Sequence, residues 1–157
     1  MHASVSRVID AARHAGLEIT VESFPEGTRT AVDAATAIGC AVDQIVKSLV
    51  FLADEAPVIA LVSGADRVDL QKLGVLAGAD AVRRAAGDEA RAATGFTIGG
   101  IPPFGHARPL TVLVDRGLMT HEVVWAAAGR PDAVFSIRPD DLVRASSGLV
   151  SDLAAPR

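Results

Sequence analysis

A single lysine interrupts an apolar, strand-like run, and this run limits what the chain can fold into. Residues 45–52 read IVKSLVFL, with apolar side chains on both alternating faces. Such a run is typical of a central strand that is covered on both sides. Lys47 shares one face with Ile45 and Leu49, and an ammonium group is rarely buried without compensation. Lys47 therefore requires a carboxylate, an opening to solvent or a bound ligand; the alternative is a strand-end lysine that extends to water.

Length and composition indicate one compact domain, which we expect to span residues 1–157. Half of the residues are hydrophobic and only 4% are aromatic, so the core is expected to be aliphatic. The single cysteine, Cys40, excludes an internal disulfide and a multi-cysteine metal site. We expect no metal and no cofactor. The sequence shows no signal-peptide h-region and no apolar stretch of membrane length, so we expect a cytoplasmic protein without membrane contact.

The net charge of −4 disfavours non-specific binding of nucleic acid, because such binding depends largely on neutralising phosphates. Local basic clusters are still present. The candidates are Arg83 with Arg84, Arg91, and the region of Arg108 and Arg116. Clusters of this kind are solvated faces more often than they are binding patches.

Hydrophobic periodicity and turn signals predict a mixture of helices and strands. Helices are expected at residues 4–15, 30–39, 69–77 and 88–94, and from residue 139 onward. Strands are expected at residues 17–21, 45–52, 58–62, 79–82, 110–114, 122–127 and 133–137. Because strands outnumber helices and several connections are hairpins, we predict an α+β fold: a mixed, largely antiparallel sheet with flanking helices.

A segment dense in glycine and proline is the second unusual feature. Residues 95–106 read GFTIGGIPPFGH. The adjacent Gly99 and Gly100 allow positive φ angles or the close approach of a ligand, and the prolines that follow stiffen the backbone. A rigid loop with exposed N–H groups can hold an oxyanion or a carbonyl oxygen. The alternative is a wide turn between two core strands; the segment matches neither a dinucleotide fingerprint nor a phosphate loop.

The lysine strand and the loop together resemble the YbaK/ProX-type aminoacyl-tRNA deacylases, the prolyl-tRNA editing domain family. The matching motifs, in order, are DQIVKSLVF at residues 43–51, DLQKL at 69–73, TGFTIGGIPPFG at 94–105 and PDDL at 139–142. The resemblance covers residues 20–150 and implies a mixed, barrel-like sheet core with flanking helices. It also implies trans-editing: hydrolysis of the ester bond of mischarged tRNA, mostly tRNA for proline, which maintains translation fidelity.

The resemblance further implies a set of site residues. The family's invariant lysine matches Lys47, and the loop glycine that lines the amino-acid pocket matches Gly100; these are the expected catalytic residues. Gly99, Ile101 and Pro102 lie beside that glycine and are expected to bind substrate, together with Ala127 and Gly129 from the sequence WAAAGRP at residues 125–131. This wall lacks the serine-glycine-glycine sequence of cysteinyl-tRNA deacylases and the histidine of alanine-specific members. It is closer to members that act on small residues such as Ala, Ser, Thr or 2-aminobutyrate.

The chemistry of further residues suggests additional roles. Thr30 is expected at the pocket entrance and Phe24 over its mouth, with helix capping and core packing as the respective alternatives. His106 either faces the site or is an exposed loop residue. Ser48 points away from Lys47 on an ideal strand, so a Ser/Lys dyad is disfavoured. The family implies that the substrate's own 2′- or 3′-hydroxyl activates the water, which makes a protein general base unnecessary.

The expected partners are mischarged tRNA and prolyl-tRNA synthetase, and the oligomeric state is expected to be a monomer or a homodimer. Two other functions stay open. The acidic net charge and the lack of an obvious base favour a non-catalytic binding module for a tRNA acceptor end or a synthetase. The third possibility is hydrolysis of an ester or thioester that is not part of a tRNA.

Overall fold

Two β-sheets form the frame of the computed structural model, which describes residues 2–24 and 30–157. The larger sheet contains β2 (Val46–Ala53), β3 (Ala56–Ser63), β4 (Val82–Arg84), β5 (Thr111–Asp115) and β8 (Leu149–Ser151). The smaller sheet contains β1 (Val21–Ser23), β6 (Val124–Arg130) and β7 (Ala133–Ile137). In space the strand orders are β4-β2-β3-β5-β8 and β1-β7-β6.

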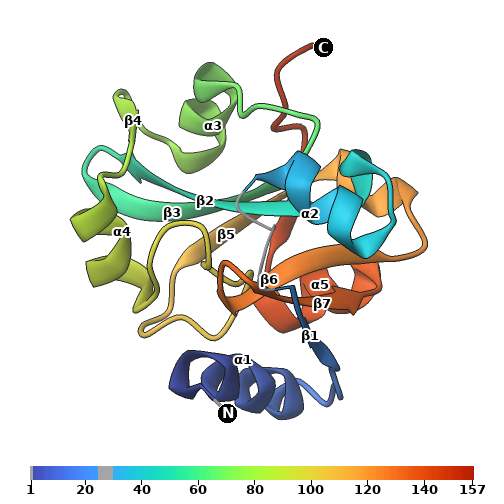
Figure 1. Cartoon of the computed structure of the whole chain (residues 1–157). Coiled ribbons are helices and arrows are strands. Elements are labelled where there is room, and N and C mark those ends of the chain that lie inside the picture. The colour runs from blue at the N-terminus through green and yellow to red at the C-terminus, as the bar shows by residue number, and fades with distance from the viewer. Residues whose placement is uncertain (1, 25–29) are drawn as a thin grey trace.

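Helices flank this frame. The α-helices are α1 (Ala3–His14), α2 (Ala31–Ile38), α3 (Leu70–Ala77), α4 (Gly87–Thr94) and α5 (Pro139–Ser146), and the short 3₁₀ helices are η1 (Val42–Gln44) and η2 (Arg116–Thr120). Figure 1 shows α3 and α1 on opposite sides of the larger sheet, with α4 at the end of the sheet near β4.

The sheet pairing confirms the predicted α+β class. The pairs β2–β3, β2–β4, β1–β7 and β6–β7 are antiparallel, whereas β3–β5 and β5–β8 are parallel. An isolated parallel bridge between Ile45 and Trp125 connects the two sheets. The frame is therefore mixed and largely antiparallel, and it stays open as two sheets instead of closing into one barrel.

Local capping signals place the helix ends as predicted. The Thr30 hydroxyl accepts a hydrogen bond from the Asp33 N–H (3.0 Å), and Gly39 ends α2 in the left-handed conformation. Asp69 caps α3 through the N–H groups of the first turn, and Pro139 occupies the start of α5. These ends depend on residues within one turn, so the sequence alone is sufficient to locate them.

The short strands differ from prediction. Residues 17–20 are not in a strand, and β1 covers only Val21–Ser23, where it pairs with β7. The strand expected at residues 79–82 is displaced to β4 at Val82–Arg84, and β8 was not predicted. Each of these strands has only three residues, so the partner that it meets in space determines its limits more than its own side-chain pattern does.

The run that contains the lysine is covered on both faces, as predicted. Val46, Val50 and Leu52 belong to the larger core, which also includes residues of α1, β6 and β7. Phe51 and Ala53 belong to a second core, where they are grouped with Leu73 of α3 and Leu113 of β5. Lys47 lies on the Phe51 face of β2 because successive side chains alternate between the two faces.

Candidate active site

A pocket of about 280 Å³ lies along the edge of β2 that faces away from β3. This edge is available because β4 pairs with β2 only over residues 51–53. Five parts of the chain line the pocket: the start of α2, residues 45–50, Arg84 and Ala85 with Ala90 of α4, the loop residues Ile98, Gly99 and Ile101, and the β6–β7 hairpin from Trp125 to Val134. Since the pocket follows a strand edge, it collects atoms from both faces of the sheet.

The backbone of β2 supplies part of the pocket wall. The Val50 carbonyl accepts from the Ala85 N–H (3.0 Å) on the β4 side, whereas the Ile45 carbonyl accepts from the Gly64 N–H (2.7 Å) on the β3 side. Peptide groups alternate between the two edges of a strand. The N–H and C=O of Ser48 therefore point toward the open edge, where they provide one donor and one acceptor.

The hydroxyl of Ser48 is a second unusual feature of this wall. Its Oγ is buried and has no hydrogen-bond partner within residues 2–24 and 30–157. Ser48 and Lys47 lie on opposite faces of β2, as the sequence predicts, so they do not form a dyad. A buried polar atom that lacks a partner is costly, and a ligand that hydrogen-bonds to it would remove that cost.

Lys47 lines the pocket and is half-buried. Its Nζ donates a hydrogen bond to the backbone carbonyl of Asp66. Burial lowers the pKa of Lys47; the nearby Asp66 carboxylate opposes this, whereas the charges of Arg84 and Arg67 lower the pKa further. Lys47 is the second residue of β2, so it lies at a strand end, as the alternative interpretation of the sequence had it. Its ammonium group does not simply extend to water, because it is hydrogen-bonded and partly desolvated.

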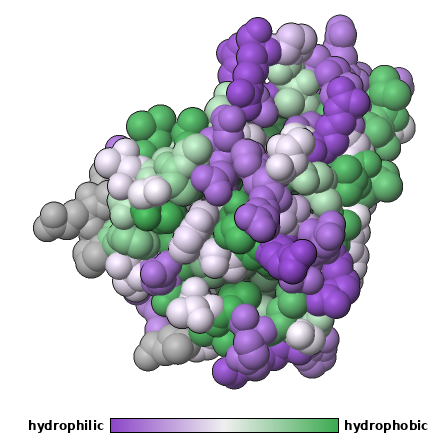
Figure 2. All heavy atoms as spheres, turned by 90° about the vertical axis from the view of Figure 1, so that its right-hand side faces the viewer, coloured by the Kyte–Doolittle hydropathy of each residue, from purple (hydrophilic) through white to green (hydrophobic). Residues whose placement is uncertain are grey.

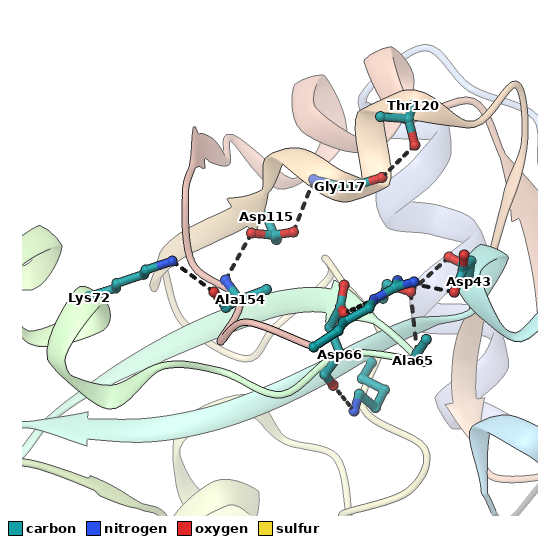
Figure 3. A network of polar contacts seen from close by, with 11 residues as sticks. Asp43, Ala65, Asp66, Lys72, Asp115, Gly117, Thr120 and Ala154 are labelled. Carbon is teal, nitrogen blue, oxygen red and sulfur yellow. Dashed lines mark hydrogen bonds and ion pairs between the residues drawn. The ribbon is translucent and has the colours of Figure 1, made fainter.

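A polar network fixes the residue that accepts the Lys47 hydrogen bond (Figure 3). Arg157 forms ion pairs with Asp66 (Nε–Oδ1, 2.6 Å) and with Asp43 (Nη2–Oδ1, 3.1 Å). The C-terminal segment is also held at Ala154, whose N–H donates to Asp115 Oδ1 (3.0 Å). These contacts attach the end of the chain to the segment after β3, so the Asp66 carbonyl has a defined position.

The glycine-proline loop enters the pocket through Gly99 and Ile101. Gly100 does not line the pocket in the described part of the chain; it is buried, and its N–H donates to the Thr97 carbonyl (3.1 Å). A Cβ at Gly100 would lie 2.8 Å from the Cα of Arg130, so close packing against the β6–β7 hairpin requires glycine there. The N–H groups of Gly99 and Ile101 have no hydrogen-bond partner among the described residues, which leaves them as the candidate oxyanion donors.

Other predicted site residues divide into two groups. Thr30 and Ala127 line the pocket, and Thr30 also caps α2, so both of its interpretations hold. Gly129 instead faces α1, where a Cβ would lie 2.7 Å from the Ser4 carbonyl oxygen. Phe24 is outside the lining, and its N–H donates to the Asp132 carbonyl (2.7 Å).

Pro102 and His106 stabilise the loop from inside. Pro102 is buried and outside the pocket lining, and its carbonyl lies 2.8 Å from His106 Nε2. His106 is half-buried, so it is neither an exposed loop residue nor a lining residue. Its burial lowers the pKa, and the hydrogen bond to Pro102 partly opposes this.

Sequence reasoning missed Arg84 as a lining residue. It was noted only as part of a basic cluster, whereas Trp125 and Pro131, expected in a wall of the pocket, do line it. Strand pairing brings Arg84 to the free edge of β2, and a local sequence pattern carries no signal for this. A β-bulge between Ala127 and Arg130 further shapes this wall.

The described residues offer neither a metal-binding cluster nor a membrane-spanning helix. Residues 2–24 and 30–157 contain no group of three or more His, Cys, Asp or Glu side chains that could hold a metal ion. No helix within these ranges is long and apolar enough to cross a membrane. On the face shown in Figure 2, hydrophilic side chains form a broad band, and hydrophobic side chains occupy separate patches beside it.

The fold and the pocket define a small α+β domain with a pocket of about 280 Å³ at the open edge of β2. The model of the aminoacyl-tRNA editing domain family matches residues 25–145, and the chain therefore belongs to that family. This confirms the resemblance that the lysine strand and the loop indicate.

Individual relatives agree with this assignment. The chain is 32% identical over 126 residues to the uncharacterized protein YwhH of Bacillus subtilis (strain 168), covering 80% of each. It is 32% identical over 100 residues to the proline–tRNA ligase of Streptococcus equi subsp. equi (strain 4047). The aligned region covers 64% of this chain but only 16% of the ligase. A crystal structure provisionally assigned as a trans-editing enzyme for prolyl tRNA synthetase superposes with a TM-score of 0.93 at 41% identity, covering 99% of both chains.

Proposed function

We propose that this protein hydrolyses the ester bond of mischarged aminoacyl-tRNA, and that its substrate is tRNA for proline carrying a small non-cognate amino acid. The observation that carries the proposal is that Lys47 lines the same pocket as Gly99 and Ile101. Membership of the editing-domain family supports the reaction class. The similarity to a proline–tRNA ligase and to a structure assigned to trans-editing supports the choice of tRNA.

The size of the pocket favours a small acyl group. Its volume of about 280 Å³ lies just below the range of about 300–1,000 Å³ that is usual for small-molecule sites. Trp125, Ala126 and Ala127 form an apolar part of the wall, where a short aliphatic side chain can be accommodated.

Each step of ester hydrolysis has a candidate group. The N–H groups of Gly99 and Ile101 stabilise the oxyanion that forms on the ester carbonyl, and loss of one such donor typically lowers the rate about 10²–10³-fold. The Lys47 ammonium stabilises negative charge on the ester or the adjacent ribose. The vicinal ribose hydroxyl of the substrate accepts a proton from the attacking water and passes its own proton to the departing ribose oxygen, so that the free amino acid and an uncharged ribose are released, in keeping with the family.

The lack of an obvious base also supports a second candidate, a non-catalytic binding module. Lys47 and Arg84 are the only charged or titratable side chains among the described residues that line the pocket. The experiment is a panel of mischarged proline tRNAs, carrying Ala, Ser, Thr, Cys or 2-aminobutyrate, incubated with the wild-type protein. Release of a small amino acid faster than the spontaneous rate supports deacylation. Saturable binding without acyl release supports the binding module and contradicts the proposal.

A role for prolyl-tRNA synthetase can be tested with the same panel. The net charge of −4 provides little general attraction for RNA. We therefore expect added synthetase to lower the concentration of tRNA that gives half-maximal deacylation. An unchanged concentration dependence would indicate that this protein selects its tRNA without the synthetase.

A further inference from the structure

Two adjacent arginines on β4 have opposite surroundings. Arg83 forms ion pairs with Glu55 (2.9 Å) and Glu89 (2.8 Å). Arg84 lines the pocket, is exposed, and has no ion pair with any described carboxylate. Its guanidinium carbon lies 5.8 Å from the centroid of the Phe51 ring. The charge of Arg83 is therefore neutralised by carboxylates of the same chain, whereas the charge of Arg84 is available to an anion that binds from outside.

Arg84 and Lys47 lie on the same side of β2. Arg84 is the register partner of Phe51, and Phe51 shares a face with Lys47. The charge of Arg84 is close enough to lower the pKa of Lys47. Two like charges at one pocket repel each other, and an anion bound between them would relieve that repulsion.

We propose that Arg84 binds the phosphate of the 3′-terminal nucleotide of the tRNA acceptor end, and so directs the aminoacyl ester into the pocket beside Lys47. This inference rests on the proposed function, because it presupposes an aminoacyl ester in the pocket. In such a substrate the 5′-phosphate of the terminal nucleotide is the anionic group nearest to the ester. An exposed arginine at the pocket is in a position to meet that phosphate while the ester lies deeper.

The chemistry of the side chain suits this task. A guanidinium offers a planar set of N–H donors that binds two phosphate oxygens together, and it keeps its charge at any physiological pH. The contact of Arg84 with the Phe51 ring restrains the direction of the guanidinium. In an acidic protein, one directed arginine would position the substrate without attracting RNA generally.

Two minimal substrates isolate the phosphate. They are 2′(3′)-O-alanyl-adenosine and the same ester with a 5′-phosphate, and they differ only in the group that Arg84 is proposed to bind. For the wild-type protein we expect kcat/KM to be about 10- to 100-fold higher for the phosphorylated ester, the range for hydrogen bonds to charged groups. Arg84→Gln should abolish this preference, and Arg84→Lys should retain part of it.

The matched control is Arg83→Gln, which alters the neighbouring residue that is already paired. It should keep the preference of the wild type. Equal kcat/KM for the two esters in the wild type, or an unchanged preference in Arg84→Gln, would overturn the inference. The thermal midpoint of each variant shows that it is folded.

A binding measurement separates this inference from the proposed function. Lys47 and Lys72 are the only lysines in the sequence, so ¹³C-lysine labelling gives two readily assigned signals. We expect adenosine 5′-monophosphate to shift the Lys47 signal at lower concentration than adenosine or inorganic phosphate does, and Arg84→Gln to remove this difference. If neither ester nor any mischarged tRNA is hydrolysed, the proposed function fails while this titration still tests Arg84. Equal affinity for inorganic phosphate and the nucleotide, or no shift of Lys47, would contradict a terminal-nucleotide site.

Discussion

The ammonium group of Lys47 is bonded to the backbone carbonyl of Asp66, while the carboxylate of the same residue is occupied by Arg157. A carbonyl orients an ammonium group without neutralising it. Lys47 therefore has a fixed direction and a positive charge that is available to a ligand in the pocket. This arrangement differs from a structural buried lysine, which is normally paired with a carboxylate.

The pKa of Lys47 should lie below its usual value of about 10.4. Burial penalises the charged form of Lys47, and the positive charges of Arg84 and Arg67 lower its pKa further, while the Asp66 carboxylate opposes them. A pH titration of the ¹³C-lysine signals, assigned with Lys72→Arg, measures this directly. If deacylation needs the ammonium form, its rate after subtraction of spontaneous hydrolysis should fall as pH rises through the measured pKa. A value at or above 10.4 would contradict the desolvated position.

Gly100→Ala should destabilise the protein through its packing. The added Cβ would lie 2.8 Å from the Cα of Arg130, and overpacking of this kind costs about 1–3 kcal/mol. Chemical denaturation measures the loss. The control is Gly87→Ala, where the nearest atom to the new Cβ is Ile98 Cδ1 at 3.9 Å. Equal stability of Gly100→Ala and the wild type would show that the loop does not pack on the hairpin as described.

His106 should make the protein less stable at acidic pH. The pKa of His106 is lowered in the folded state because burial disfavours the charged ring. The unfolded chain then binds more protons than the folded one between the folded pKa and about 6.5, so stability falls as pH decreases through that range and levels off below it. The thermal midpoint of the wild type should drop more between pH 7.5 and pH 5 than that of His106→Gln. Parallel curves for the two proteins would count against this account.

Ser48→Ala should leave the free protein equally stable or more stable. The buried hydroxyl has no partner among the described residues, and removal of such a group spares a cost of about 1–3 kcal/mol. If the hydroxyl binds the substrate, the same change should raise KM for deacylation. Denaturation and steady-state kinetics test the two parts separately, and a large loss of stability would show that Ser48 Oγ is satisfied in solution.

The sequence predicts the parts of the structure that depend on nearby residues. Thr30, Asp69 and Pro139 mark helix starts because a cap needs only the following turn. The two-sided burial of β2 follows from its nearly continuous run of apolar residues, which places apolar side chains on both faces. Lys47 could be identified as a candidate site residue because a single charge in an apolar run needs a carboxylate, an opening to solvent or a bound ligand.

The remaining features depend on which segments meet in space. Gly100 reads as a ligand-contacting glycine, but its role in packing is visible only once Arg130 is placed beside it. Arg83 and Arg84 are equivalent in the sequence, and the pairing of β4 with β2 gives them different surroundings. The three-residue strands β1, β4 and β8 were misplaced or missed for the same reason.

The most direct test of the central claim is deacylation by Lys47→Met with enzyme in excess over mischarged proline tRNA. The control is Lys72→Met, which removes the other lysine, bonded to Asp152 (3.0 Å) away from the pocket. We predict that Lys47→Met folds with a thermal midpoint at or above that of the wild type, since it replaces a partly desolvated charge, and that it releases the amino acid at the spontaneous rate. Lys72→Met should deacylate like the wild type. Wild-type deacylation by Lys47→Met would contradict the claim that this ammonium group serves the reaction.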